Sequence, residues 1–204
     1  MSAHVPLYSW RKPSYQYVAL RVLQQMWDPR HVSALDVGGG TGIMAYTIKT
    51  LFGLKRMASV DVQNRFVPSL GIETKIYDGT TLPFGDRSFE CVLLLNVLHH
   101  VPVAARAALL RECRRVAGRG PIYIKDHLSN GGADDGRLAI LDLLGNIPFS
   151  GMLRASYLRE EDWRELASLT GYATSAYVSG KYRTGLMEAL FPNRLEVSMR
   201  WWPI

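Results

Sequence analysis

The chain of 204 residues has few cysteines and no long hydrophobic run, and both absences exclude classes of protein. Its two cysteines, Cys91 and Cys113, cannot build a disulfide framework or, unaided, a structural zinc site. No apolar stretch approaches the roughly 18–20 residues that a transmembrane helix needs. The first residues also lack the basic and apolar regions of a secretory signal. These absences predict a cytoplasmic protein without a membrane span.

The remaining composition is typical of one folded domain. Hydrophobic residues make up 48% of the chain and charged residues 21%, which is enough apolar sequence for a buried core. The net charge of +6 is compatible with an anionic partner, but the basic residues are mostly arginines dispersed along the chain. Length and composition therefore predict a single domain, residues 1–204.

Apolar runs and helical spacings alternate in the order typical of an open parallel α/β sheet. The expected strands are residues 32–37, 56–62, 74–77, 89–97 and 121–125, with two final strands at 172–183 and 194–202. The expected helices are one that begins at Pro13 and others at 43–52, 102–117, 136–144 and 159–170. The helix over 102–117 is expected to bury an apolar stripe that includes Val103.

The most informative stretch is a glycine-rich turn between an expected strand and an expected helix. It reads Asp-Val-Gly-Gly-Gly-Thr-Gly from Asp36 to Gly42. Glycines permit a tight turn and let a ligand approach the main chain, and the helix start favours an anionic or polar ligand. A dinucleotide fingerprint would place its third small residue at Ile43, and no Gly-Lys-Ser/Thr of a P-loop follows.

This turn resembles the first motif of class I S-adenosylmethionine-dependent methyltransferases. Further stretches resemble the family in the same order. They are residues 59–62, 78–79, 82–90, 97–101, 111–120 and 157–172. Residues 82–90 and 97–101 resemble a small-molecule subgroup that includes quinone-biosynthesis enzymes ("type 11"). The resemblance covers roughly residues 31–180.

The resemblance implies an α/β fold with a three-layer, Rossmann-like arrangement. Its seven-stranded sheet would be mostly parallel with an antiparallel C-terminal strand, and S-adenosylmethionine would be the methyl donor. The implied cofactor-binding residues are Asp36, Gly38, Gly40, Gly42, Asp61, Asp78, Gly79 and Asn96. Asp61 would accept hydrogen bonds from the ribose hydroxyls and Asp78 from the adenine amino group. A solvated acid at the strand end and a plain Asp-Gly turn are the alternatives for these two residues.

In open α/β sheets the ligand lies beyond the carboxyl ends of the strands, so polar side chains there are candidates for the acceptor site. His127 and His100 are the candidate catalytic residues, because a histidine can take a proton near neutral pH. The candidate substrate-binding residues are Asp126, Asn146 and Tyr157. Structural histidines, an exposed helix face and a core tyrosine are the alternatives.

Two further expectations concern metals and the cover of the site. A hard divalent ion needs several oxygen ligands together, and no second acid clusters with Asp126 and Asn96, so no metal site is predicted. Residues 1–30 are expected to form an N-terminal helical cap, and residues 129–157 a lid over the active site.

The predicted function is methyl transfer to an O, N or C atom of a small molecule: a secondary metabolite, a quinone-like compound or a lipid precursor. One alternative is an RNA (tRNA or rRNA) methyltransferase, and another is a cofactor-binding partner subunit without an acceptor site of its own. Nucleic acid is disfavoured because residues 96–99 differ from the Asn/Asp-Pro-Pro-aromatic turn of amino-methylating enzymes. The sequence does not indicate the acceptor or the oligomeric state.

Overall fold

A computed structural model describes residues 13–146, 155–175 and 177–204 of the chain. The strands are β1 (Ser33–Val37), β2 (Arg56–Asp61), β3 (Glu73–Ile76), β4 (Cys91–Leu95), β5 (Ile122–His127), β6 (Tyr172–Thr174) and β7 (Glu196–Pro203). The helices are α2 (Pro13–Met26), α3 (Ile43–Phe52), α4 (Val103–Ala117), α5 (Ala133–Asn146), α6 (Glu160–Leu169) and α7 (Leu186–Leu190). Two 3-10 turns are described as well, η1 (Leu98–His100) and η3 (Asn193–Leu195).

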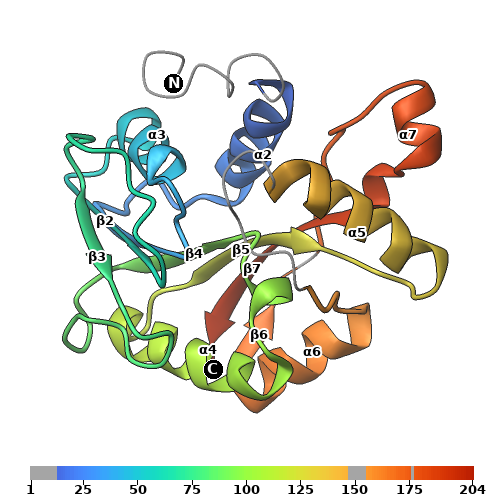
Figure 1. Cartoon of the computed structure of the whole chain (residues 1–204). Helices are drawn as coiled ribbons and strands as arrows, with labels where there is room; N and C mark the ends of the chain where they lie inside the picture. The colour runs from blue at the N-terminus through green and yellow to red at the C-terminus, as the bar shows by residue number, and fades with distance from the viewer. Residues whose placement is uncertain (1–12, 147–154, 176) are drawn as a thin grey trace.

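The seven strands form one sheet in the order β3-β2-β1-β4-β5-β7-β6. Strands β1 to β5 pair in parallel, whereas β7 is antiparallel to both β5 and β6. Helices α2, α3 and α5 lie on one side of the sheet, and α4 and α6 on the other (Figure 1). The predicted three-layer α/β fold with an antiparallel C-terminal strand is therefore confirmed.

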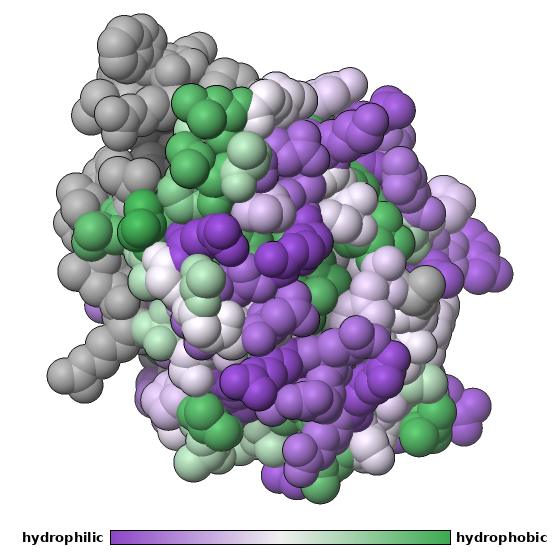
Figure 2. Space-filling view, turned by 90° about the vertical axis from the view of Figure 1, so that its right-hand side faces the viewer, coloured by the Kyte–Doolittle hydropathy of each residue, from purple (hydrophilic) through white to green (hydrophobic). Residues whose placement is uncertain are grey.

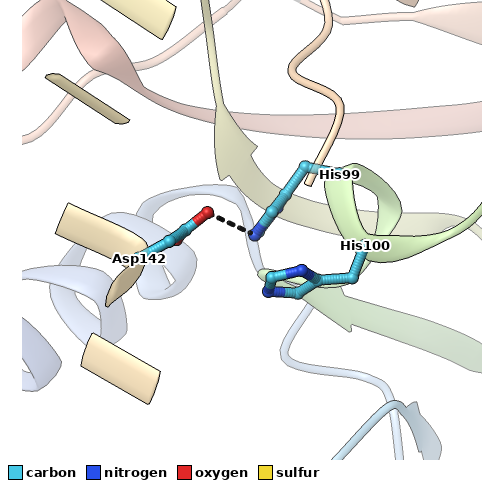
Figure 3. Close-up of side chains that lie close together, drawn as sticks. All are labelled: His99, His100 and Asp142. Carbon is cyan, nitrogen blue, oxygen red and sulfur yellow. Dashed lines mark ion pairs between the residues drawn. The ribbon is translucent and has the colours of Figure 1, made fainter. Parts of the chain in front are cut away.

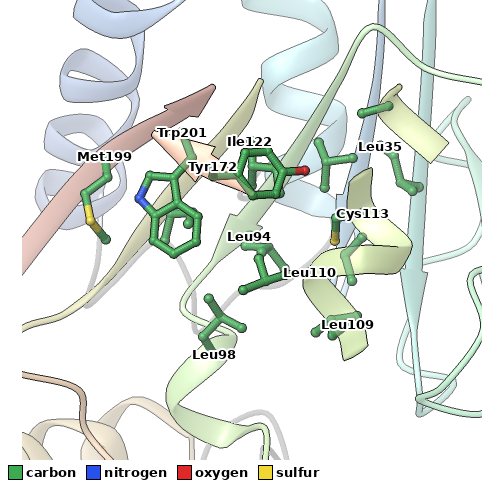
Figure 4. Packing of buried hydrophobic residues seen from close by; sticks show 14 of the residues in the cluster. Leu35, Leu94, Leu98, Leu109, Leu110, Cys113, Ile122, Tyr172, Met199 and Trp201 are labelled. Carbon is green, nitrogen blue, oxygen red and sulfur yellow. The ribbon is translucent and has the colours of Figure 1, made fainter. Parts of the chain in front are cut away.

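The core fills the space between the sheet and its helices, because the central strands are buried on both faces. All but the last residue of β4 are buried, as expected for a strand covered by helices on each side. Trp163 of α6 and Trp201 of β7 are fully buried and meet edge to face, with ring centroids 6.1 Å apart. Figure 4 shows Trp201 beside Leu94 and Ile122, so β7 completes the core that β4 and β5 begin.

Two sequence expectations about the second half of the chain are wrong. The strand expected over 172–183 ends at Thr174. Among the described residues beyond it, Ser175 donates to the Arg200 carbonyl and Val178 forms an isolated bridge with Ser198. After Val178 the chain packs on α2, where a Cβ added to Gly180 would lie 2.7 Å from Val18. In α4 the predicted apolar stripe is buried except for Val103, which is 66% exposed because it begins the helix beyond the edge of the core.

The surface around α5, α6 and α7 is mostly hydrophilic, and its hydrophobic residues are scattered (Figure 2). Leu186, Met187 and Leu190 of α7 are among the exposed apolar side chains. None of the helices in the described part of the chain is long and apolar enough to cross a membrane.

The strand order places a topological switch point between β1 and β4. The chain proceeds from β1 outward to β2 and β3, and then from β4 outward in the opposite direction. Ligands of open α/β sheets bind at the carboxyl ends of the strands beside such a point. The loops after β1 and β4 meet there, since a Cβ on Gly38 would lie 2.7 Å from the Val97 side chain.

Candidate functional site

The glycine turn after β1 adopts a backbone conformation that only glycine takes readily. Gly38, Gly40 and Gly42 have φ angles of 75°, 58° and 76°. A Cβ on Gly40 would meet nothing within 4 Å, so the main chain at this point faces open space. The turn is therefore packed against the β4 loop at Gly38 and accessible to a ligand at Gly40.

Asp61, the last residue of β2, is tied directly to this turn. Its Oδ2 accepts the Gly40 N–H at 2.8 Å, and its Oδ1 accepts the Gln63 N–H at 2.9 Å. The Arg65 guanidinium lies 3.3 Å from Oδ2. The carboxylate stands beside the open Gly40 backbone, as the sequence-based hypothesis requires, although its contact with a ligand stays a prediction.

Asp78 follows β3 and shapes its own turn. Its exposed carboxylate accepts the N–H groups of Thr80 at 2.8 Å and Thr81 at 2.9 Å, both through Oδ1. A hydrogen bond from the Thr80 side chain, together with these backbone bonds, lowers the pKa of Asp78 to about 2, so it carries a full negative charge at neutral pH. Gly79 has a φ of 83°, which fits the Asp-Gly turn. The turn gives Asp78 a local structural role, and its contact with a ligand stays a prediction.

Asp36 lies beneath the glycine turn and is only 2% exposed. Its Oδ2 accepts a hydrogen bond from the Ser59 hydroxyl at 2.9 Å, and a Cβ on Gly39 would fall 2.3 Å from the same oxygen. Burial raises the pKa of Asp36 to about 7, despite the bond from Ser59. Asp36 therefore supports the turn from below, and its place in the cofactor site stays a prediction.

The buried Asp36 carboxyl should make stability depend on pH. Its folded-state pKa lies above the unfolded value, so the folded protein holds a proton that the unfolded chain loses as the pH rises from about 4 to 7. The folded state therefore becomes less stable as the pH rises through this range, and Asp36→Asn removes this pH dependence. The variant should gain about 2–3 kcal/mol relative to wild type between pH 5 and pH 8. Urea unfolding at several pH values measures this; a stability difference independent of pH would contradict it.

A second group of polar residues lies at the carboxyl ends of β4 and β5. Lys125 donates to the Asn96 side-chain oxygen and to Glu196 Oε2, each at 2.6 Å, and also to the Tyr15 hydroxyl. Glu196 is 1% exposed and pairs with Arg183 as well. Burial would raise the pKa of Glu196, but the charges of Lys125 and His127 outweigh it and hold this pKa well below its usual range.

His127, the last residue of β5, lies between two carboxylates. Its Nε2 is 3.3 Å from Asp142 Oδ1 and its Nδ1 is 3.3 Å from Glu196 Oε2. Burial would lower the pKa of His127, but these two carboxylates outweigh it and raise the pKa to about 9. The ring is therefore protonated at neutral pH, which does not favour it as a proton acceptor. A catalytic role for His127 stays a prediction.

Asp126 orients the neighbouring His99, which lies on η1. Asp126 Oδ1 is 2.5 Å from His99 Nδ1 and accepts the His127 N–H at 2.7 Å, while Oδ2 accepts the Leu98 N–H at 3.0 Å. The Asp126 side chain is fully buried. This geometry makes Asp126 a residue that positions His99, and its predicted contact with substrate has no support in these bonds.

The side chains of His99, His100 and Asp142 lie close together, next to His127 (Figure 3). His99 Nε2 is directed at Asp142 Oδ2, 3.4 Å away, and the rings of His99 and His100 have centroids 4.0 Å apart. Tyr157 donates a 2.7 Å hydrogen bond to Asp142 Oδ2. The predicted residues His100 and Tyr157 are thus brought together, whereas the side chain of Asn146 lies outside the described part of the structure.

A large cavity lies at the opposite edge of the sheet. It has a volume of about 1080 Å³ and is lined by residues that precede β1, β4 and β5. Five arginines and three acids line it: Arg30, Arg87, Arg114, Arg115, Arg119, Asp28, Asp86 and Glu90. Its charge is mixed and it lies away from the glycine turn, so it does not belong to the candidate site.

The sequence analysis did not identify Glu196, which contacts Lys125 and His127. Glu196 begins β7, 69 residues after His127 in the chain (196 − 127). The signal that could have found it is an acid at the start of an apolar strand, between Leu195 and Val197. Such an acid needs a buried cationic partner, and the antiparallel pairing of β5 and β7 brings Lys125 and His127 to it.

Comparison with known proteins identifies a domain type. Residues 35–124 match the model of the methyltransferase domain family. The chain is 26% identical over 151 residues to a flavonoid 4'-O-methyltransferase of Glycine max. That match covers 69% of this chain and 40% of the plant protein, so the chain spans less than half of this relative's length.

Solved structures share the fold over nearly the whole chain. One is a complex between the Trm112 methyltransferase activator of Haloferax volcanii and its methyltransferase partner, with a TM-score of 0.71 and 15% identity. It matches over 93% of this chain and 91% of the other. Another is magnesium protoporphyrin IX methyltransferase of Synechocystis with bound SAH, with a TM-score of 0.64, 17% identity and coverage of 94% and 84%. The same protein is also known with bound SAM.

Proposed function

We propose that the chain is a class I S-adenosylmethionine-dependent methyltransferase and transfers a methyl group from S-adenosylmethionine to a small-molecule acceptor. The match of residues 35–124 to the methyltransferase domain family supports this. The observation that carries the proposal is the hydrogen bond from the Gly40 N–H to Asp61, which joins the glycine turn to the end of β2 at the switch point of the sheet. The polar group at the ends of β4 and β5 stands along the same edge.

The residues beside the glycine turn and Asp61 fit this cofactor. The space beside Gly40 leaves room for a ligand against the main chain, and the Asp61 carboxylate next to it can accept hydrogen bonds from a cis-diol such as ribose. Asp78 offers a second ionised carboxylate after the neighbouring strand β3. When bound, S-adenosylmethionine supplies an activated methyl group and its leaving group. The protein's tasks are then to align the acceptor and to exclude water.

The acceptor is proposed to lie against His100 and Tyr157. His100 is only partly buried, and Tyr157 stands beside it through their common neighbours His99 and Asp142. A hydroxyl acceptor suits this polar surface, and O-methylation by the flavonoid relative supports that class. We further propose that α2 and α5 cover this edge as cap and lid, since α2 carries Tyr15 to Lys125 and α5 carries Asp142 to His127. Residues 1–12 of the predicted cap and 147–154 of the predicted lid lie outside the described part of the chain.

An RNA acceptor is the weaker candidate. The arginines of the large cavity could attract phosphates, but the cavity also holds acids and lies at the edge of the sheet opposite the glycine turn. A protein partner is the other alternative, by analogy with the archaeal methyltransferase in its complex with an activator. RNA binding that weakens steeply with salt would support the former, and transfer only after a partner is added would support the latter.

The cofactor should stabilise the folded chain, because a ligand that binds only the native state raises apparent stability. At 100 times its dissociation constant it contributes about 2.7 kcal/mol, which shifts the melting temperature of a domain of this size by several degrees. Thermal melting with and without S-adenosylmethionine or its demethylated product measures this. ATP is the matched control and should give no such shift, because it shares only the adenosine part. Equal melting temperatures with and without excess cofactor would contradict the proposal.

A further inference from the structure

His99 holds a buried nitrogen that finds no hydrogen-bond partner among the described residues. The side chain is fully buried, and its Nδ1 is fixed by Asp126 at 2.5 Å. This contact turns Nε2 away from Asp126 and towards Asp142, yet Nε2 makes no hydrogen bond there. An unpartnered buried polar atom is costly, so this orientation needs an explanation.

The three side chains that converge on this point have the chemistry of a metal site. The ligand atoms of His99, His100 and Asp142 all lie within 4.8 Å of one another (Figure 3). His99 Nε2 and Asp142 Oδ2 are 3.4 Å apart. Two ligands on one tetrahedral zinc ion, with bonds of about 2.0–2.1 Å, lie about 3.3 Å from each other. The observed separation is therefore compatible with both atoms binding one ion.

The surrounding contacts are those of a metal ligand shell. A histidine that binds a metal almost always gives its other ring nitrogen to a carboxylate or a carbonyl group, which fixes the ring and increases its basicity. Asp126 holds His99 in this way, and Tyr157 donates to the same Asp142 oxygen that faces His99. Sequence reasoning expected no metal because it looked for clustered acids, whereas this group has two imidazoles and one carboxylate.

We propose that His99, His100 and Asp142 bind one first-row divalent transition-metal ion, of which zinc is the representative case. Two imidazoles with one carboxylate suit such ions, while calcium and magnesium prefer oxygen ligands throughout. Three protein ligands leave a coordination position open, as in catalytic rather than structural sites. The open position would bind an oxygen of the methyl acceptor, and this part of the proposal rests on the proposed function.

The test is metal binding by the full chain, without cofactor. After removal of metals with a chelator, the protein is titrated with Co²⁺, whose visible absorption reports a low-coordinate site, and with Zn²⁺ in competition. We expect one ion per chain. His100→Gln and Asp142→Asn should each weaken binding at least 100-fold. Asp126→Asn, which leaves the three ligands in place, should weaken it about 10- to 100-fold. The control His31→Gln changes a histidine that contacts Tyr123 far from the group and should leave binding unchanged.

Because His99 is buried, its variants could lose the fold, and the partly exposed His100 keeps the test decisive. No stoichiometric Co²⁺ binding, or binding that His100→Gln and Asp142→Asn leave intact, overturns the inference. The cofactor-induced melting shift, measured on the metal-free protein, is a separate result. A shift without metal binding rejects the metal site alone, and metal binding without a shift rejects the proposed function alone.

Discussion

Asp61→Ala is expected to weaken the binding of S-adenosylmethionine by about 10- to 150-fold. The carboxylate lies at the end of β2 and accepts the Gly40 N–H, so it faces the place proposed for the ribose. Hydrogen bonds to a charged group contribute about 1.5–3 kcal/mol, and each 1.4 kcal/mol is a tenfold change in affinity. Isothermal titration calorimetry with the cofactor and with its demethylated product measures the loss.

Two further variants separate a ribose contact from a general effect on the fold. Asp61→Asn keeps the shape and one acceptor oxygen, so we expect a smaller loss of affinity than with alanine. Asp86→Ala removes an acid that pairs with Arg115 at the opposite edge of the sheet and should leave affinity unchanged. Wild-type affinity in Asp61→Ala would rule out the proposed role, whichever way the other variants behave.

Glu196→Gln should destabilise the protein by about 3–5 kcal/mol, the cost of leaving a buried charge without its partner. Glu196 pairs with Lys125 at 2.6 Å and with Arg183, and it lies 3.3 Å from His127. These cations are mostly buried, so water cannot replace the lost carboxylate. Equilibrium urea unfolding measures the change.

The matched control is Glu161→Gln, the same substitution in an exposed pair. Glu161 lies 3.8 Å from Arg159 with both side chains more than half exposed, and such pairs contribute about 1 kcal/mol or less. We expect this variant to unfold close to wild type. If Glu196→Gln were as mild as the control, the buried network would not hold the C-terminal strands to β5 in the way the contacts indicate.

The sequence by itself determined the sheet, its parallel part and the position of the glycine turn. Local patterns sufficed: a strand buried on both faces is a continuous apolar run, as in β4, and left-handed backbone at Gly38, Gly40 and Gly42 requires glycine. The helix expected over 43–52 is observed with the same limits. The end of β6 at Thr174 was not predictable in this way, because the path of the later chain depends on tertiary contacts such as that of Gly180 with α2.

Only the tertiary structure decided the composition of the polar group at the carboxyl ends of β4 and β5. His99 follows β4, Asp126 is the second-last residue of β5, Asp142 lies on α5 and Glu196 begins β7, so no local spacing joins them. Their protonation and their usefulness as ligands depend on distances and burial that arise when the strands pair. A histidine is identical in sequence whether it accepts a proton, carries one between two carboxylates or faces an ion, and the fold alone distinguishes these states.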